Sequence, residues 1–228
     1  MQNKLIPSFG RRKARKLRTQ SQKAYQELLP LLQLDSPQKL FDQASSDVWL
    51  EIGFGGGEHF CEQLEQNPSI SMIGCEPFMN GVAHLLLLLA PEDYERVRIW
   101  HEDVRHLFGI IPSSYFSRVF ILFPDPWPKK RHQRRRLITS EFINILQQKL
   151  KNSALLHIAS DDSAYVEQIQ AILYHHPHFV LLEGPPSADP LTWSSRPKDW
   201  PTSRYEQKAL NQGKKCAYMV FQKCEISK

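Results

Sequence analysis

Residues 122–136 read L-F-P-D-P-W-P-K-K-R-H-Q-R-R-R. They place a carboxylate and an indole between prolines and then continue into a dense basic run. Proline fixes φ and removes a backbone donor, so this segment predicts a stiffened loop rather than a helix or a central strand. The loop presents Asp125, a charge-stabilising group, and Trp127, a stacking surface, and six Lys or Arg side chains follow. This combination suits an electron-rich nucleobase attached to a phosphate backbone.

The position of the loop favours a binding role over a solvated surface turn. Residues 117–123, S-R-V-F-I-L-F, form an apolar run of strand length directly before it. The loop therefore follows the carboxyl end of a predicted strand, where open α/β sheets bind ligands.

A glycine turn supplies a second chemical signal in E-I-G-F-G-G-G, residues 51–57. It leaves a predicted strand and enters a predicted helix, and glycines such as Gly53 and Gly55 allow a ligand to approach the backbone closely. A dinucleotide fingerprint would need Gly or Ala at position 58, where the chain has Glu58. Glu51 and Glu58 would repel a pyrophosphate but attract the cationic sulfonium and ammonium of S-adenosylmethionine, which is the expected cofactor.

Two further carboxylates follow strand ends. Glu76 ends the next predicted strand, where a carboxylate can accept both ribose hydroxyl protons. Asp103 follows the strand that ends at Trp100, and there it would lie near the adenine amine. Acidic residues at successive strand ends beside a glycine turn favour one shared cofactor site.

Strands alternate with helices along the chain, which predicts βαβ units and a parallel sheet. The expected strands are Val48–Ile52, Ile70–Cys75, Val97–Trp100, Val119–Phe123, Ala154–Ala159 and Cys216–Gln222. The expected helices are Gln22–Leu34, Gly56–Gln66, Asn80–Leu89, Arg135–Leu150 and Ser163–Tyr174. The aperiodic segment 184–201, with five prolines and two tryptophans, predicts an ordered functional loop. Residues 1–20 are expected to form a basic arm, flexible when alone, and residues 21–228 a single domain.

Composition bounds the partners. The chain has 228 residues, a net charge of +5 and a pI near 9.0, with its basic excess clustered at residues 11–18 and 129–136. Such clustering favours a polyanion. Four cysteines without C-x-x-C or zinc-ligand spacing predict no metal site and no disulfide framework, which fits the cytoplasm. The apolar run 82–90 is too short to span a bilayer, so no membrane association is expected.

These motifs closely resemble those of the bacterial tRNA (guanine-N7)-methyltransferases, over nearly the whole chain. The likeness rests on S-F-G-R-R at 8–12, L-E-I-G-F-G-G-G-E at 50–58, G-C-E-P at 74–77, E-D-V at 102–104, F-P-D-P-W-P-K-K-R-H at 123–132, A-S-D at 159–161 and S-R-Y-E at 203–206. The F-P-D-P-W-P-K-K-R-H string is highly specific, whereas the glycine turn alone indicates only a class I methyltransferase. The family commonly begins its last motif with Thr, where this chain has Ser203.

The resemblance implies a Rossmann-like class I methyltransferase fold, α/β, with a doubly wound, mostly parallel sheet and helices on both faces. It implies methyl transfer from S-adenosylmethionine to N7 of guanine 46 in the variable loop of tRNA. By this likeness the cofactor carboxylates are Glu51, Glu76, Asp103 and Asp125, and Asp125 is also catalytic. The substrate-contacting positions implied are Lys129, Asp161, Ser203, Arg204, Tyr205 and Glu206. Asp162 leaves open which of two adjacent carboxylates faces the guanine.

Guanine N7 carries a lone pair and no proton, so the transfer needs alignment and charge stabilisation more than a general base. One alternative is methylation of an exocyclic amine, since P-D-P-W faintly resembles the Asp/Asn-Pro-Pro-aromatic loop of such enzymes. Another is a non-catalytic tRNA-binding protein that has kept the fold. No obligatory protein partner is expected, and the chain is predicted to be a monomer or a homodimer.

Overall fold

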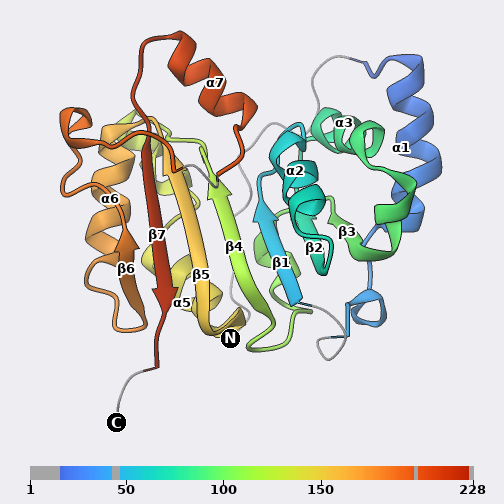
Figure 1. The fold of residues 1–228 in the computed structure, drawn as a ribbon, viewed down its shortest axis with the longest axis horizontal. Coiled ribbons are helices and arrows are strands. Elements are labelled where there is room, and N and C mark those ends of the chain that lie inside the picture. Colours follow the sequence, from blue (N-terminus) through green and yellow to red (C-terminus); the bar gives the residue numbers. More distant parts are fainter. Residues whose placement is uncertain (1–15, 43–46, 198–199, 226–228) are drawn as a thin grey trace.

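The computed structural model describes residues 16–42, 47–197 and 200–225, and these form one seven-stranded sheet with helices on both faces (Figure 1). The strands are β1 (Asp47–Ile52), β2 (Ile70–Cys75), β3 (Val97–Trp100), β4 (Phe116–Leu122), β5 (Leu150–Ser160), β6 (Phe179–Glu183) and β7 (Ala217–Lys223). The α-helices are α1 (Thr19–Leu32), α2 (Glu58–Gln66), α3 (Met79–Leu88), α4 (Val104–Leu107), α5 (Ser140–Lys149), α6 (Ser163–Leu173) and α7 (Arg204–Asn211). Short 3-10 turns are η1 (Pro37–Lys39), η2 (Pro91–Arg96), η3 (Lys130–Arg135) and η4 (Pro190–Thr192).

The strand order is β3-β2-β1-β4-β5-β7-β6, and β7 runs antiparallel to the other six strands. From β1 the chain builds outward through β2 to β3, and then returns to place β4 and β5 on the other side. The strand order therefore reverses between β1 and β4, which creates a crevice beyond their carboxyl ends. The predicted doubly wound, mostly parallel Rossmann-like sheet is confirmed.

Two apolar cores lie on opposite faces of the sheet, because successive strand residues point to opposite sides. Leu50 of β1 packs in a core with Phe142 of α5, whereas its neighbour Trp49 packs in a core with Phe60 of α2. The second core also contains Trp200, from the proline-rich segment before α7. Trp200 packs against His157 of β5 and Tyr218 of β7, and the functional role predicted for the segment stays a prediction.

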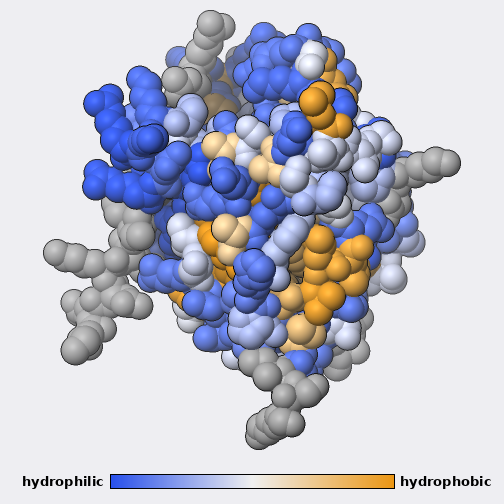
Figure 2. Space-filling view, turned by 90° about the vertical axis from the view of Figure 1, so that its left-hand side faces the viewer, coloured by the Kyte–Doolittle hydropathy of each residue, from blue (hydrophilic) through white to orange (hydrophobic). Residues whose placement is uncertain are grey.

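The outer strand β6 closes one edge of the sheet and was not predicted. On this side apolar patches lie within a largely hydrophilic surface (Figure 2). Val180 and Leu182 of β6 are 51% and 50% exposed. The register with β7 shifts between Leu181 and Glu183, and such a bulge with a charged residue limits edge-to-edge association.

Several element boundaries differ from the sequence prediction. The helix predicted from Arg135 was wrong at its start: residues 130–135 form η3, and α5 begins at Ser140 after the Thr139 hydroxyl accepts a hydrogen bond from the Phe142 N–H at 3.2 Å. A hydroxyl N-cap of this kind fixes a helix start. The first helix begins at Thr19, and residues 1–15 of the predicted basic arm lie outside the described residues.

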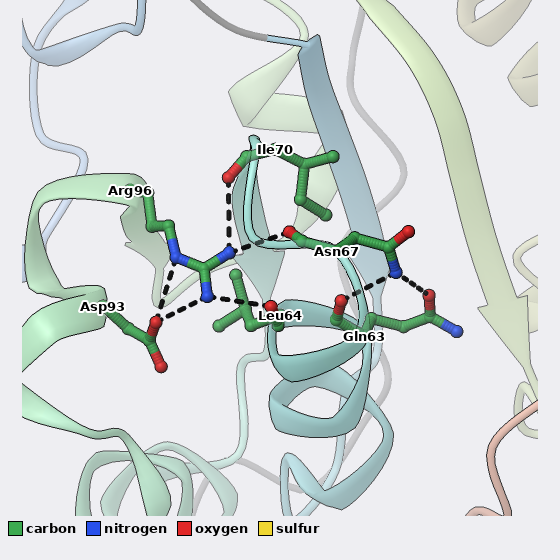
Figure 3. Close-up of polar contacts among 6 residues, drawn as sticks. All are labelled: Gln63, Leu64, Asn67, Ile70, Asp93 and Arg96. Carbon is green, nitrogen blue, oxygen red and sulfur yellow. Dashed lines mark hydrogen bonds and ion pairs between the residues drawn. The ribbon is translucent and has the colours of Figure 1, made fainter.

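Arg96 fixes the chain before β2 (Figure 3). Its guanidinium donates to the carbonyls of Leu64 at 2.8 Å and Asn67 at 3.0 Å and to the Asp93 carboxylate at 2.6 Å. One side chain therefore joins the end of α2, the turn into β2 and η2. These bonds hold the start of β2 in place, and Glu76 follows the carboxyl end of the same strand.

Helix α3 packs directly against the glycine turn. The His84 Nδ1–H donates to the Gly56 carbonyl at 2.7 Å. Gly81 lies so close that a Cβ atom there would stand 2.2 Å from the Gly55 carbonyl oxygen. The absence of a side chain at Gly81 is thus what lets the helix approach the turn.

We predict that Gly81→Ala forces α3 and the glycine turn apart and lowers the free energy of unfolding by about 1–3 kcal/mol, as overpacking does. Gly109→Ala is the matched control, since a Cβ there meets only the His106 carbonyl at 3.2 Å in an exposed turn. Chemical denaturation of both variants measures the difference. Equal stability of the two variants would contradict the close packing at Gly81.

Candidate active site

A cavity of about 390 Å³ opens at the carboxyl ends of β1, β2 and β4, which is a size typical of sites for small ligands. Its lining includes five of the residues predicted to bind the cofactor or the substrate: Gly53, Glu76, Asp103, Asp125 and Tyr205. The carboxylates predicted after β2, β3 and β4 therefore share one cavity. Arg105, Trp127 and Arg135 also line it.

The glycine turn contributes Gly53 to the cavity lining. Gly53, Gly55 and Gly57 have φ of +77°, +58° and +86°, a left-handed conformation that favours glycine. The Gly55 N–H donates to the Glu76 carboxylate at 2.9 Å, so the turn is held against the end of β2.

Glu76 is buried, and its carboxylate accepts hydrogen bonds from the backbone N–H groups of Gly55 and Phe78, both at 2.9 Å. Burial raises the pKa of Glu76 to about 7, although the two N–H donors lower it. The negative charges of Asp125 and Glu51 add to the increase in this pKa. A cavity that disfavours carboxylate charge in this way would be stabilised by a bound cation.

Asp103 caps the short helix α4. Its carboxylate accepts from the Arg105 N–H at 2.9 Å and pairs with the Arg105 guanidinium at 3.1 Å. Trp100 holds the same turn by donating its indole N–H to the Asp103 carbonyl at 2.9 Å. Arg105 was not predicted as a site residue, and the only signal for it in the sequence was a cation two residues after the predicted carboxylate.

Asp125 lies on the proline-rich loop, solvent-accessible but facing the cavity, and the surrounding protein raises its pKa by desolvation. The loop is neither helix nor strand, as predicted. Trp127 lines the cavity, and its ring packs against the Arg135 guanidinium at 4.9 Å and edge to face with His132 at 5.8 Å.

The basic run after this loop divides into two kinds of side chain. Lys129, Lys130, Arg131 and Arg134 are exposed, as expected for a surface that meets a polyanion. Arg136 was expected to belong to the same surface, and the structure corrects this, because it is 2% exposed and donates to the Pro126 carbonyl at 2.7 Å. Sequence alone could not separate a buried arginine from its solvated neighbours.

Glu51 does not line the cavity. Its carboxylate is buried on β1 and pairs with His59 Nδ1 of α2 at 2.9 Å, while His59 Nε2 lies 3.3 Å from Gln63 Nε2. It nevertheless lies near enough to Glu76 to raise the pKa of that residue. Glu51 thus contributes negative potential from behind the glycine turn.

The S-R-Y-E motif begins α7. The Ser203 hydroxyl accepts from the Glu206 N–H at 3.1 Å, and Glu206 accepts in return from the Ser203 N–H, which forms a capping box. The buried Glu206 carboxylate also accepts from the Tyr218 hydroxyl at 2.6 Å and pairs with Arg196 at 3.0 Å. This network fixes the helix start and leaves the two residues between, Arg204 and Tyr205, exposed.

Tyr205 joins α7 to the cavity. A Cβ atom built at Gly55 would lie 2.9 Å from the Tyr205 ring, so the ring rests on the glycine turn. Helix α7 itself crosses above the carboxyl ends of the central strands (Figure 1). This helix was not predicted, although S-x-x-E is the pattern of a capping box and was the signal for it.

The two adjacent carboxylates after β5 have different partners. Asp162 caps α6 by accepting from the Tyr165 N–H at 2.8 Å. Asp161 instead pairs with Lys214 at 2.6 Å, near the surface.

The described residues contain no group of His, Cys, Asp and Glu suited to a metal ion. Among them, no helix is long and apolar enough to cross a membrane.

The raised pKa of Glu76 predicts a pH dependence of stability. The pKa of this carboxyl is about 7 in the folded protein, against a usual 4.5. Between pH 4.5 and 7 the folded protein therefore keeps a proton on Glu76 that the unfolded chain has released. Stability from this group is therefore greatest below about pH 4.5 and is lost as pH rises to 7, by roughly 3 kcal/mol in total.

The Glu76→Gln variant cannot ionise at this position, so its stability should lack this loss. Denaturation of wild type and variant from pH 5 to 8 gives the difference at each pH, and the exposed Glu92→Gln serves as the control. A stability difference between wild type and Glu76→Gln that stays constant with pH would contradict the assigned pKa.

Comparison with known folds relates this architecture to solved methyltransferases. An antibiotic-related methyltransferase matches with a TM-score of 0.55 and 13% identity, covering 87% of this chain and 94% of that chain. The 16S rRNA methyltransferase KamB matches with a TM-score of 0.57 and 12% identity, covering 80% and 91%. Identities this low support the fold alone.

Sequence comparison is more specific. The family described as "Putative methyltransferase" matches residues 45–219. A tRNA (guanine-N(7)-)-methyltransferase of Rhodospirillum rubrum is 38% identical over 225 residues, covering 94% of this chain and 87% of that protein. Another, from Paramagnetospirillum magneticum, is 43% identical over 211 residues, covering 89% and 87%. The chain therefore belongs to the tRNA (guanine-N7)-methyltransferase family.

Proposed function

We propose that this protein transfers the methyl group of S-adenosylmethionine to N7 of a guanine in tRNA, at position 46 of the variable loop. The observation that carries the proposal is the convergence of Glu76, Asp103 and Asp125 beside the glycine turn in one cavity. Membership of the family supports the reaction and the tRNA substrate. We further propose that the protein works in the cytoplasm, where tRNA is modified.

The cavity fits S-adenosylmethionine in size and in charge. Its volume is about 390 Å³, and four carboxylates line it, those of Glu76, Glu102, Asp103 and Asp125, against the guanidinium groups of Arg105 and Arg135. We assign Glu76 to the ribose hydroxyls, Asp103 to the adenine amine, and Gly53 and Gly55 to the close approach of the ligand. Glu51 attracts the ammonium group through its charge. When bound, the cofactor supplies an electrophilic methyl on a cationic sulfonium.

The protein's part in the reaction is alignment and electrostatic stabilisation. Positive charge develops on the guanine ring as the methyl arrives, and the Asp125 carboxylate at the cavity rim stabilises that charge. No proton leaves N7, so Asp125 acts as an anion rather than as a base. Desolvation, which raises its pKa, also strengthens its interaction with a cationic ring.

We assign Asp161 to the guanine Watson–Crick edge, whose N1–H and amino group suit a carboxylate acceptor. The support is that Asp162 is already engaged as the α6 cap. The Asp161–Lys214 pair is partly exposed, and such pairs contribute only about 0–1 kcal/mol, so guanine can replace the lysine at little cost. Lys129, with its exposed basic neighbours, and Arg204 are assigned to the tRNA phosphates.

The decisive assay combines purified protein, labelled S-adenosylmethionine and unmodified tRNA. We expect 7-methylguanosine as the product on nucleoside mass spectrometry, at position 46 on mapping. N2-methylguanosine or N6-methyladenosine would support the exocyclic-amine alternative instead. Binding of tRNA without turnover would support a non-catalytic role.

We predict that Asp125→Ala lowers kcat by about 10²–10³-fold, the usual effect of removing one transition-state electrostatic group, while tRNA affinity persists. Single-turnover rates and filter binding separate the two quantities. The exposed Glu92→Gln again controls for loss of a surface carboxylate. Unchanged kcat in Asp125→Ala would remove this residue from the mechanism.

The assignment of Asp161 is tested with two isosteric variants. Asp161→Asn should lower kcat/KM for tRNA by about 10–100-fold, because a hydrogen bond to a charged group contributes about 1.5–3 kcal/mol. Asp162→Asn should retain activity, since Asn caps a helix as well as Asp does. The opposite pattern would assign the guanine to Asp162.

A further inference from the structure

The loop that carries Asp125 has a strained backbone on both sides of the carboxylate. Phe123 has a φ of +52° and Trp127 a φ of +43°, both in the left-handed region that favours glycine. Such a conformation is strained in a non-glycine residue and persists only where surrounding contacts impose it. The contacts that impose it here therefore determine where Asp125 stands.

One contact lies on each side of Asp125. Before it, the Phe123 N–H donates to the Ala159 carbonyl of β5 at 2.8 Å. After it, the Pro126 carbonyl accepts from the Arg136 Nε–H at 2.7 Å. Pro126 stands between Asp125 and Trp127 in the chain, so this second bond acts in the middle of the loop.

Arg136 is itself rigidly held. One of its terminal nitrogens donates to the Ala164 carbonyl at 3.1 Å and to the Gln168 side-chain oxygen at 2.8 Å, both in α6. Its guanidinium lies over the Tyr165 ring at 4.8 Å. A planar, forked cation can meet all of these partners at once, whereas a lysine ammonium cannot.

The same guanidinium also approaches the turn after β5, which carries Asp161, the residue assigned to the guanine. Its other terminal nitrogen lies 3.9 Å from the Asp162 carboxylate, next to Asp161. The charge is buried, with 2% exposure, and burying a cation is costly unless it is paired and hydrogen-bonded. The side chain thus connects the loop after β4 with the turn after β5.

We infer that Arg136 is a positioning residue: it holds the Asp125 loop in its strained form and fixes it relative to the Asp161–Asp162 turn, rather than binding RNA phosphate. The inference rests on the proposed function, in which Asp125 stabilises the reacting guanine. Loss of the fork should let the loop relax, and a misplacement of about 1 Å can lower a rate by 10²-fold.

The test compares Arg136→Lys and Arg136→Ala with Arg134→Ala, which removes an exposed arginine two residues away. Each variant is assayed where circular dichroism shows it fully folded. Both Arg136 variants should lower kcat by about 10–100-fold and keep KM for tRNA and the salt dependence of binding. Arg134→Ala should raise KM for tRNA and reduce the slope of log affinity against log salt by about 1.

Guanidinium rescue separates positioning from general destabilisation. Millimolar guanidinium or methylguanidinium should restore part of the kcat of Arg136→Ala, and ammonium should not. Should the Arg136 variants fail to fold, Gln168→Ala removes one of the anchors of the guanidinium and should lower kcat in the same direction by a smaller factor.

Two results would overturn the inference. The first is an unchanged kcat in folded Arg136 variants, or in Gln168→Ala if the Arg136 variants do not fold. The second is a slope of log affinity against log salt that falls by about 1 when Arg136 is replaced. Failure of the proposed function looks different, because wild-type protein would then form no 7-methylguanosine. The wild-type assay therefore comes first.

Discussion

The Glu76 carboxylate is the centre of the site, because its two oxygens accept the backbone N–H groups of Gly55 and Phe78. These bonds tie the glycine turn after β1 to the start of the connection into α3. They also hold an acid in a buried position where it titrates with a pKa of about 7. The same group therefore fixes the shape of the cavity and makes that cavity favour a cation, and Gly81 and His84 of α3 keep the turn in place from behind.

The loops around this centre are held by side chains far along the chain. Arg136 reaches back to Pro126, Glu206 reaches forward to Tyr218, and Tyr205 rests on the glycine turn. In a doubly wound sheet the strand ends meet at one edge, but their loops leave in different directions. Long-range bonds of this kind determine how the loops converge, and they explain why so many charged side chains near the site are buried and paired.

The parts that could be predicted from the sequence are those with local causes. Glycine turns, proline-restricted loops and apolar strand runs are set by the residues themselves, and the strands Ile70–Cys75 and Val97–Trp100 have the predicted bounds. The missed or misjudged parts depend on tertiary context. Nothing local distinguishes the buried Arg136 from the exposed Arg134, and β6 is a strand only because β7 returns beside it. Helix α7 is different, since its start has a local cause, the capping box that S-R-Y-E encodes.

The charges of the site act over two different ranges. The acidic groups Glu76, Asp103 and Asp125 line a small cavity, where they lie close to a bound ligand and salt screens little over such short distances. The exposed cations of η3 and α7 lie outside it, in water, where interactions beyond about 8 Å are screened at physiological salt. Attraction of a polyanion is thus a long-range, salt-sensitive property of the rim, whereas the preference for a small cation is a short-range property of the interior. A single sheet edge can in this way bring together two ligands of opposite charge without either set of side chains neutralising the other.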